Sequence, residues 1–376
     1  MNQLEYYLSK TFLIFFGWIF SLCPLDNEKV VFASARDNGP TGNLAALIKA
    51  YQTAYPQAHI VLDFKTYSYG LIGKLQYVLS LVKTTYHLKT ARYFFVDNAL
   101  FPVHVVKHRE GTTVVQVWHA TGIMKKFGLD TPVKERKVEN RFLHKNYDYV
   151  IADSEPTCDA YSRAFGTQRE RVLALGSART DALLAPNAAK IAREKLLRKY
   201  PELAGKTLLL YAPTFRGFSA QKESARSLDV TSLKQALGSS LAVLYKPHAV
   251  ITPQASQAFD VVLDSKSDIN DYLPGVDGVI SDYSSIIFEA ALLSKPLYKM
   301  CGDYASYNTQ NGFYLDYLHD VPGINCIGTH ELIKEIKENG VQLSPEQAEQ
   351  YRVFVGRYCT FSDGAAVQRI LNRFPL

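Results

Sequence analysis

Short apolar runs recur along the chain and alternate with longer segments in which apolar residues recur at helical spacing. Valine, isoleucine and aromatic residues dominate the short runs, which is typical of buried strands. Strands that alternate with helices predict parallel sheets with helical crossovers. The predicted strands are residues 30–33, 59–63, 93–96, 113–117 and 149–152 in the first half and residues 207–212, 241–245, 278–281 and 296–299 in the second.

The two groups of strands predict an α/β protein with two doubly wound, Rossmann-like domains and a cleft between them. A length of 376 residues, 47% of them hydrophobic, is enough for two cores. Between the groups, a charged helix is expected at residues 187–200 and is stopped by Pro201, so the boundary is placed within residues 187–206. The expected domains are residues 1–190 and 205–376, and the last helix may return to pack on the first domain.

Two apolar segments of the first half lie outside this strand pattern. Residues 11–23 are apolar and aromatic but shorter than the roughly 18–20 residues that span a bilayer, and no signal-peptide pattern accompanies them. A helix is also expected from Leu71, with one apolar stripe flanked by Lys74 and Lys83. For both segments, burial in the core and insertion into a membrane interface remain open. The stripe consists of Leu75, Val78, Leu79, Val82 and Tyr86.

The net charge of +6 is unevenly distributed. Residues 64–145 hold 14 Lys and Arg against 5 Asp and Glu, a surplus of +9 that leaves −3 for the rest of the chain. A nucleic acid, a phosphorylated substrate or an anionic lipid surface could meet this region, and a solvated basic face is the alternative. No recognised nucleic-acid-binding module accompanies the surplus, so no nucleic-acid partner is expected. The surplus favours the membrane interpretation of the helix from Leu71.

The five cysteines are scattered and show no C-x-x-C spacing. They therefore indicate neither a disulfide framework nor a zinc site, and they fit a reducing, cytoplasmic setting.

Polar clusters follow four of the predicted strands. Ligands of open α/β sheets bind beyond the carboxyl ends of the strands, so four clusters at such ends indicate a binding site. The clusters are His119, Pro213-Thr214-Phe215-Arg216, Lys246-Pro247-His248 and Asp282-Tyr283-Ser284-Ser285.

The last cluster predicts an anion site. Ser284 and Ser285 are expected to cap a helix that runs to about Ser294, so that backbone N–H groups, two hydroxyls and the helix dipole would meet a phosphate. Glu289 could then reach ribose hydroxyls. The alternative is an ordinary capped helix with a solvated glutamate.

His119 is a candidate general base. It stands at a strand end, and Gly122, Lys125 and Lys126 follow it. A neutral imidazole there could take a proton from an attacking hydroxyl, which is typically worth about 10²- to 10⁴-fold in rate. A structural hydrogen-bonding role is the alternative for His119 and equally for His248.

Lys246 and Arg216 are expected to form a cationic wall suited to a diphosphate. The sequence contains no Walker-type loop, H-E-x-x-H, G-x-S-x-G or D-x-D motif. We therefore expect protein cations, with no metal and no cofactor, to neutralise the leaving group.

Several strings of the chain resemble the CDP-glycerol glycerophosphotransferase family. They occur in the family's order over residues 115–317. The strings are Val117-Trp118-His119-Ala120-x-Gly122 with Lys125-Lys126-Phe127-Gly128, Gly176-Ser177-Ala178-Arg179-x-Asp181, Tyr211-Ala212-Pro213-Thr214-Phe215-Arg216, Lys246-Pro247-His248, Ser281-Asp282-Tyr283-Ser284-Ser285 and Asn311-Gly312-Phe313-Tyr314-Leu315-Asp316.

The resemblance implies a GT-B architecture in which the second domain holds CDP-glycerol and the first meets the acceptor. It also implies a Gram-positive enzyme of wall teichoic acid synthesis, attached peripherally to the cytoplasmic face of the cell membrane, with other teichoic acid enzymes as candidate partners. The implied catalytic residues are His119 and His248. The implied substrate-binding residues are Gly122, Lys125, Lys126, Arg179, Pro213, Thr214, Arg216, Lys246, Asp282, Ser284, Ser285 and Glu289.

Two departures from the family pattern refine this expectation. Ala120 stands where much of the family has glycine, and together with the Lys-Lys-Phe-Gly that follows it looks more like the primase branch, which is also similar in length. Glu289 stands where the family commonly has aspartate. A primase adds one glycerol phosphate to an undecaprenyl-diphosphate-linked disaccharide of N-acetylmannosamine and N-acetylglucosamine. A polymerase of the family, a GT-B glycosyltransferase and a catalytically silent scaffold are the alternatives.

Overall fold

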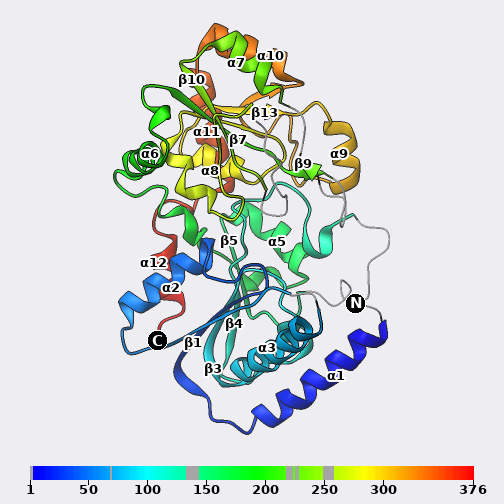
Figure 1. Ribbon diagram of the computed structural model, residues 1–376. Helices are drawn as coiled ribbons and strands as arrows, with labels where there is room; N and C mark the ends of the chain where they lie inside the picture. The colour runs from blue at the N-terminus through cyan, green and yellow to red at the C-terminus, as the bar shows by residue number, and fades with distance from the viewer. Residues whose placement is uncertain (1–2, 68–69, 133–143, 217–222, 225–227, 249–257) are drawn as a thin grey trace. The chain divides into compact units, whose positions relative to one another are not determined.

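The structure, a computed structural model, describes residues 3–67, 70–132, 144–216, 223–224, 228–248 and 258–376. The chain forms two compact units (Figure 1). The first unit comprises residues 1–120, 126–181 and 360–376, and the second comprises residues 121–125 and 182–359. The chain therefore enters the second unit twice, first for only five residues. The domain limits expected from the sequence, 1–190 and 205–376, stay a prediction.

A six-stranded parallel sheet in the order β2-β1-β3-β4-β5-β6 forms the middle of the first unit. All five strands predicted for this half are present, and β6, of only three residues, was missed. The central strands are buried on both faces because helices cover both sides of the sheet. The strands are β1 (Asp26–Ser34), β2 (His59–Phe64), β3 (Ala91–Val96), β4 (Thr113–Gln116), β5 (Tyr149–Ala152) and β6 (Val172–Ala174).

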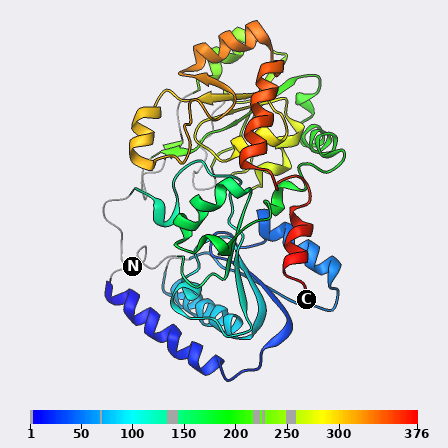
Figure 2. The same cartoon turned by 180° about the vertical axis from the view of Figure 1, so that it is seen from behind.

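Helices α2 and α12 pack together on one face of this sheet, as Figure 2 shows with α12 in red. Phe32 and Phe95 of the sheet, Tyr51 of α2 and Phe374 after α12 share one core. The last helix thus belongs to the first unit. The α-helices are α1 (Gln3–Phe20), α2 (Gly42–Ala54), α3 (Leu71–Thr90), α4 (Phe101–Val105), α5 (Cys158–Phe165) and α12 (Ala366–Arg373), and the 3₁₀ helices are η1 (Gly128–Asp130), η3 (Glu155–Thr157), η4 (Arg169–Arg171) and η5 (Ala178–Thr180).

Helices α1 and α3 lie side by side (Figures 1 and 2), and both carry exposed apolar side chains. Tyr6 and Leu13 of α1 pack with Leu81 of α3, and Val82 packs partly against the same cluster. Apart from Val82, the predicted stripe on α3 is exposed. We call the exposed side chains the α1–α3 patch; they are Leu4, Tyr7, Leu8, Phe12, Ile14, Phe15 and Trp18 on α1 and Ile72, Leu75, Val78, Leu79 and Tyr86 on α3.

Across the described ranges, none of the helices combines the length and the apolar character that crossing a bilayer requires.

The second unit is built on another six-stranded parallel sheet, in the order β11-β10-β7-β12-β13-β14. The four predicted strands are present. The last of them begins one residue later than expected, after Pro296. The edge strands were missed because they span only two or three residues. The strands are β7 (Thr207–Ala212), β10 (Leu241–Tyr245), β11 (Val261–Val262), β12 (Gly278–Ser281), β13 (Leu297–Met300) and β14 (Ile324–Cys326), and β8 (Phe215–Arg216) pairs with β9 (Glu223–Ser224) in an antiparallel ribbon.

Helices cover both faces of this second sheet. Leu233 of α7 and Leu332 of α10 enter the core on one side with Val243, while Phe288 of α8 stacks on Phe354 of α11 with ring centroids 5.1 Å apart. The helices are α6 (Ala188–Lys199), α7 (Val230–Leu237), α8 (Ile286–Leu292), α9 (Tyr304–Asn311), α10 (Thr329–Asn339) and α11 (Pro345–Tyr358), with η6 (Pro201–Leu203), η7 (Ile269–Asp271) and η8 (Leu273–Gly275).

Candidate active site

His119 lies beyond the carboxyl end of β4 and has a defined tautomer. Its Nδ1 is 3.0 Å from the main-chain oxygen of Asp97 at the end of β3. A carbonyl oxygen only accepts, so Nδ1 carries the hydrogen and Nε2 keeps its lone pair. No described residue hydrogen-bonds to Nε2. Burial, together with the nearby charges of Arg36 and Arg179, lowers the pKa of His119 to about 3. The imidazole is therefore a neutral proton acceptor.

The residue before it, Trp118, adopts a backbone conformation that is unusual for a bulky side chain. Its φ is +53°, and such a conformation costs on the order of 1–3 kcal/mol. The indole stacks on Phe127 at 4.8 Å and meets the edge of Phe165 at 5.1 Å. Gly128, with φ +57°, is required because a Cβ there would lie 2.3 Å from the main-chain oxygen of Ala164. The string from Trp118 to Gly128 is thus anchored in the first unit at both ends.

Two buried amides hold the peptide groups around Trp118. Asn43 of α2 donates from Nδ2 to the carbonyl oxygens of Val117 and Trp118, at 2.9 and 3.0 Å. Gln116 accepts from the N–H of Trp118 at 2.9 Å and donates to the carbonyl oxygen of Asn98 at 3.3 Å. Sequence analysis missed both residues. These hydrogen bonds stabilise the turn at Trp118 and offset the cost of its positive φ.

The Asn43 side chain also reaches the Gly176-Ser177-Ala178-Arg179 string. Its Oδ1 accepts from the hydroxyl of Ser177 at 3.0 Å and from the backbone N–H of Arg179 at 2.9 Å. Arg179 then donates from Nη1 to the main-chain oxygen of His119 at 3.0 Å. The structure therefore brings His119 and Arg179, two of the predicted site residues, together.

In the second unit, Arg216 is bound by two carboxylates at the carboxyl ends of β12 and β13. Its Nε and Nη2 donate to Asp303 at 2.7 and 3.2 Å, and its Nη1 lies 2.9 Å from Asp282. Asp282 is fully buried and also accepts from the N–H and hydroxyl of Thr214, at 2.7 and 2.9 Å. Burial alone would lower the pKa of Arg216, but Asp303 and Asp282 raise it above its ordinary value.

Two tyrosine rings flank the Arg216 guanidinium. The ring centroids of Tyr283 and Tyr307 are 5.3 and 4.7 Å from it, and the two rings stack 4.2 Å apart. Tyr283 donates its hydroxyl to Asp303 at 2.8 Å, and Lys125 donates to the hydroxyl of Tyr307 at 3.2 Å. The predicted residues Lys125, Thr214, Arg216 and Asp282 thus belong to one cluster, which we call the arginine cluster.

Glu289 is buried within the second unit, which excludes the solvated alternative. It accepts from the hydroxyl of Thr121 at 2.9 Å. Gly122 has φ +65°, and a Cβ there would lie 2.4 Å from the ring of Phe288. Both the positive φ and the close approach of Phe288 therefore require glycine at this position.

The expected serine cap of α8 is wrong in detail. Ser285 occupies the N-cap position but already has helical φ and ψ of −64° and −15°, and its side chain makes no capping bond. A capping residue normally has extended backbone angles, from which its oxygen reaches the helix N–H groups. Ser284 accepts from the N–H of Ile286, at 3.4 Å. The helix ends at Leu292, before the expected Ser294.

The expected cationic wall has a different arrangement. Lys246 is buried and donates to the carbonyl oxygens of Ser265 and Pro247, at 2.9 and 3.3 Å, and burial lowers its pKa. His248 lies 5.0 Å from the ring of Phe215, edge to face. Lys246 therefore stabilises the strand-end loop, while Arg216 is paired with carboxylates.

Pro213 is buried directly after β7, next to Thr214. Lys126 is half-buried and is the residue at which the chain returns to the first unit.

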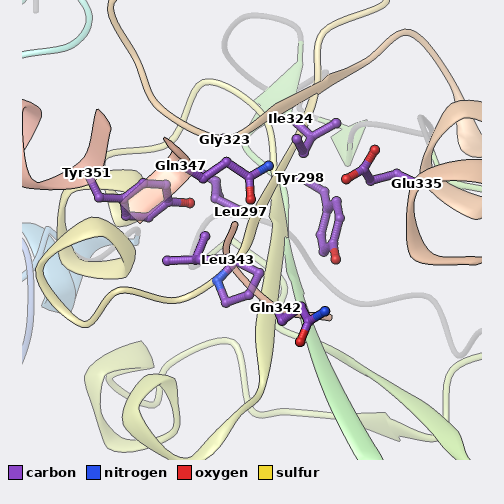
Figure 3. Close-up of a pocket in the computed structure, with 10 residues that line it drawn as sticks. Leu297, Tyr298, Gly323, Ile324, Glu335, Gln342, Leu343, Gln347 and Tyr351 are labelled. Atoms are coloured by element: carbon purple, nitrogen blue, oxygen red, sulfur yellow. The ribbon is translucent and has the colours of Figure 1, made fainter. Parts of the chain in front are cut away.

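A cavity of the second unit lies away from these residues. Figure 3 shows it between Leu297, Gly323 and Tyr351, at the amino ends of β13 and β14. The hydroxyls of Tyr298 and Tyr351, which line it, bond to main-chain oxygens. The cavity is a packing gap opposite the edge where the predicted residues gather.

Among the described residues, no group of three or more His, Cys, Asp or Glu could hold a metal ion.

Other contributors that sequence analysis missed are Asp97, Asp303 and Tyr307. Asp97 and Asp303 follow β3 and β13, so the rule that ligands bind at strand carboxyl ends could have found them. Nothing in the sequence singles out Asn43, which lies inside α2.

A sequence model described as "CDP-Glycerol:Poly(glycerophosphate) glycerophosphotransferase" matches residues 15–375. The chain is 33% identical to a teichoic acid ribitol-phosphate primase of Bacillus spizizenii, over 94% of this chain and 92% of that protein. It is 29% identical to a teichoic acid glycerol-phosphate primase of Bacillus subtilis, over 78% of this chain and 76% of that protein.

A polymerase of the same pathway is also similar. A teichoic acid poly(ribitol-phosphate) polymerase of Bacillus spizizenii is 31% identical over 97% of this chain and 60% of its own length. Among solved structures, the wall teichoic acid polymerase TagF superposes with a TM-score of 0.78 at 20% identity, over 100% of this chain and 98% of that chain. This likeness confirms the expected GT-B architecture.

Proposed function

The chain belongs to the CDP-glycerol:poly(glycerophosphate) glycerophosphotransferase family, and from this premise we propose that it is a primase. The proposed reaction transfers glycerol phosphate from CDP-glycerol to the undecaprenyl-diphosphate-linked disaccharide of N-acetylmannosamine and N-acetylglucosamine, and releases CMP. The observation that carries the proposal is His119, whose neutral imidazole keeps a free lone pair on Nε2 because Nδ1 donates to Asp97.

In the proposed reaction, a sugar hydroxyl of the acceptor attacks the β-phosphorus of CDP-glycerol in line. The new O–P bond forms while Nε2 of His119 takes the hydroxyl proton. The bond from the β-phosphorus to the bridging oxygen breaks, and CMP leaves with that electron pair. A base whose pKa is about 3 is weak, which suits a loose transition state in which the hydroxyl keeps its proton until late.

The arginine cluster supports binding of the donor in this proposal. Arg216 offsets the charge of the diphosphate with His248 and the helix start at Ser284 and Ser285. Asp282 is fully buried and paired with Arg216, so its proposed role is to orient Arg216 rather than to touch a phosphate. Glu289 keeps its proposed role at the ribose hydroxyls.

The remaining predicted residues are proposed to line the substrate site. Their position in the family strings supports this assignment. They are Gly122, Lys125, Lys126, Arg179, Pro213, Thr214 and Lys246.

We further propose that the α1–α3 patch docks on an anionic membrane surface at its cytoplasmic face. The patch is apolar and exposed, Lys74 and Lys83 are exposed beside it, and residues 64–145 carry a charge surplus of +9. Apolar side chains that enter the headgroup region and lysines that meet anionic lipid act together in such binding.

Liposome flotation tests this docking. Lys74→Glu with Lys83→Glu should weaken flotation with anionic vesicles and leave the low binding to neutral vesicles unchanged. Lys334→Glu with Lys337→Glu, two exposed lysines on α10, is the matched control for net charge. Equal flotation of all three proteins would contradict the docking proposal.

The transfer reaction is tested with radiolabelled CDP-glycerol and the lipid-linked disaccharide. One added unit with stoichiometric CMP supports the primase. Many added units would identify a polymerase, and transfer only from a UDP-sugar would identify a glycosyltransferase.

Ribitol phosphate is the second candidate for the transferred group, because the relative at 33% identity is named a ribitol-phosphate primase. Equimolar CDP-glycerol and CDP-ribitol in one reaction separate the two. The glycerol proposal predicts that glycerol phosphate dominates the product, and the reverse would replace it.

A further inference from the structure

We propose that Asn43 and Gln116 are positioning residues for His119, which they serve by fixing the backbone of Trp118. The inference rests on the proposed function, in which His119 is the general base. Neither amide touches the imidazole, so neither is a catalytic residue. Their effect passes through the two peptide groups that flank Trp118.

The two amides hold Trp118 from both sides. Its N–H is bound by Gln116, and its carbonyl oxygen, which belongs to the peptide group that leads into His119, is bound by Asn43. Both amide side chains are buried. Because φ of Trp118 is +53°, the turn would relax towards an ordinary conformation if these bonds were lost. Such a change would rotate His119 away from its bond to Asp97.

The orientation of the Asn43 amide is unambiguous. Its Nδ2 faces two carbonyl oxygens, and its Oδ1 faces the hydroxyl of Ser177 and the N–H of Arg179. A flipped amide would place donors against donors and acceptors against acceptors. One neutral side chain therefore links α2, the His119 turn and the Arg179 turn.

Neutral amides suit this task for an electrostatic reason. A carboxylate at either position would face main-chain oxygens and add a negative charge near the imidazole, where it would favour protonation. Asn43 and Gln116 supply the same geometry without charge. They therefore do not oppose the neutral state of His119, which burial and the charges of Arg36 and Arg179 favour.

Asn43→Asp tests the proposal with almost no change of shape. It places an oxygen against the carbonyl oxygens of Val117 and Trp118, so kcat should fall about 10²-fold, as a small misplacement of a reacting group can cause. The KM for CDP-glycerol should stay within about twofold. Gln116→Glu keeps the acceptor for the Trp118 N–H, so its loss should be smaller.

Tyr51→Phe is the matched control. Tyr51 lies on the same helix and is equally buried, and its hydroxyl donates to the main-chain oxygen of Phe374 at 2.6 Å. This variant loses one buried hydrogen bond at a distance from the His119 turn. It should keep kcat within about twofold of the unmodified enzyme.

A double-mutant cycle separates positioning from a general structural role. In a His119→Ala background, Asn43→Asp should lower the residual rate less than about threefold, because the group it positions is gone. A full 10²-fold loss in that background would overturn the proposal. So would a kcat for Asn43→Asp within about threefold of the unmodified enzyme.

The tautomer of His119 gives a readout that does not depend on activity. In ¹⁵N-histidine spectra, the His119 signals are identified by their absence in His119→Gln. The unmodified enzyme should show hydrogen on Nδ1, and Asn43→Asp should show a mixture of tautomers. Gln116→Glu provides the same readout if Asn43→Asp does not fold. An unchanged tautomer in both variants would sink the positioning role, whereas a shifted tautomer without any transfer from CDP-glycerol would sink only the proposed function.

Discussion

The turn that carries His119 and the arginine cluster both lie at strand carboxyl ends, yet opposite kinds of interaction hold them. Neutral amides, a main-chain carbonyl and the guanidinium of Arg179 hold the turn that carries His119. Two carboxylates hold Arg216. A proton acceptor must stay uncharged, and burial together with the nearby cations Arg36 and Arg179 keeps the imidazole neutral. A cation that meets a diphosphate must stay charged and in place, so the chain pairs it with charges.

Three other histidines of the first unit are also buried in their neutral form. His87, His104 and His144 are all buried, and burial lowers their pKa values to about 3, about 3 and about 4. None of them belongs to the proposed chemistry. The first unit is therefore sensitive to acid through buried histidines that lie outside the proposed chemistry, as well as through His119.

The largest expected effect follows from those histidines. As the pH falls below 6.5, the unfolded chain binds protons that the folded unit does not bind, so stability is full above pH 6.5 and is lost progressively towards pH 3. Each histidine contributes a loss of about 1.4 kcal/mol per pH unit. Both tryptophans, Trp18 and Trp118, lie in the first unit, so tryptophan fluorescence in urea at pH 7.5 and 5 measures the loss.

One further histidine opposes this trend. Burial lowers the pKa of His108, but its bond to Asp148, 3.2 Å away, raises the pKa above the ordinary value. This pair adds stability below pH 6.5 and offsets part of the loss. An unchanged urea midpoint between pH 7.5 and 5 would contradict the expected acid sensitivity.

His119→Ala tests the neutral side of the comparison through activity. The rate of CMP release should fall about 10²- to 10⁴-fold, while CDP-glycerol binding measured by calorimetry stays close to that of the unmodified enzyme. His59→Ala, at an exposed position in the first unit, is the control. Near-normal turnover of folded His119→Ala would remove the base assignment.

Asp282→Ala tests the charged side through stability. The variant removes the buried carboxylate that binds Arg216 and Thr214. Removing one partner of a buried ion pair lowers the free energy of unfolding by about 3–5 kcal/mol. Hydrogen exchange should speed up in β7 and β12 and stay unchanged in β1 and β3. Equal changes in all four strands would show that the effect is not confined to the arginine cluster.

Asp303→Asn should have the smallest effect. The Asp303 side chain is 44% exposed, and a pair so open to water contributes at most about 1 kcal/mol. Because the variant removes an anion that competes for Arg216, the Kd for CDP-glycerol should fall about threefold at low salt, as calorimetry can measure. Glu349→Gln, exposed on α11, controls for net charge. A higher Kd for CDP-glycerol would contradict this expectation and would mean that Asp303 orients Arg216 for the donor.

Most of the fold could be predicted from the sequence because long buried strands carry a strong pattern. The nine predicted strands are all present, whereas β6, β11 and β14 are too short for such a pattern. Residues 121–125 belong to the second unit, although they lie within a string that begins and ends in the first. Tertiary contacts alone decide that assignment, so no local pattern could reveal it.

The candidate site could be predicted only in part. Histidines and arginines at strand ends could be identified from the sequence, because the chemistry of those residue types is specific. The pairing of Arg216 with Asp303 was harder to predict, since Asp303 is more than 80 residues away along the chain. Asn43 and Gln116 could not be identified, because an amide in a helix or strand has no signature until its neighbours are known.

The place of α12 in the first core has a consequence for the time course of synthesis. Ile370 and Phe374 pack with Phe32 and Tyr51, but the 178 residues from 182 to 359 are made in between. At about 5–20 residues per second, roughly 10–35 s separate the two parts of that core. During this interval the part of α2 that packs on α12 lacks its partner. We therefore expect chaperones to meet the nascent protein there, and the second unit to be fully synthesised before the first can close.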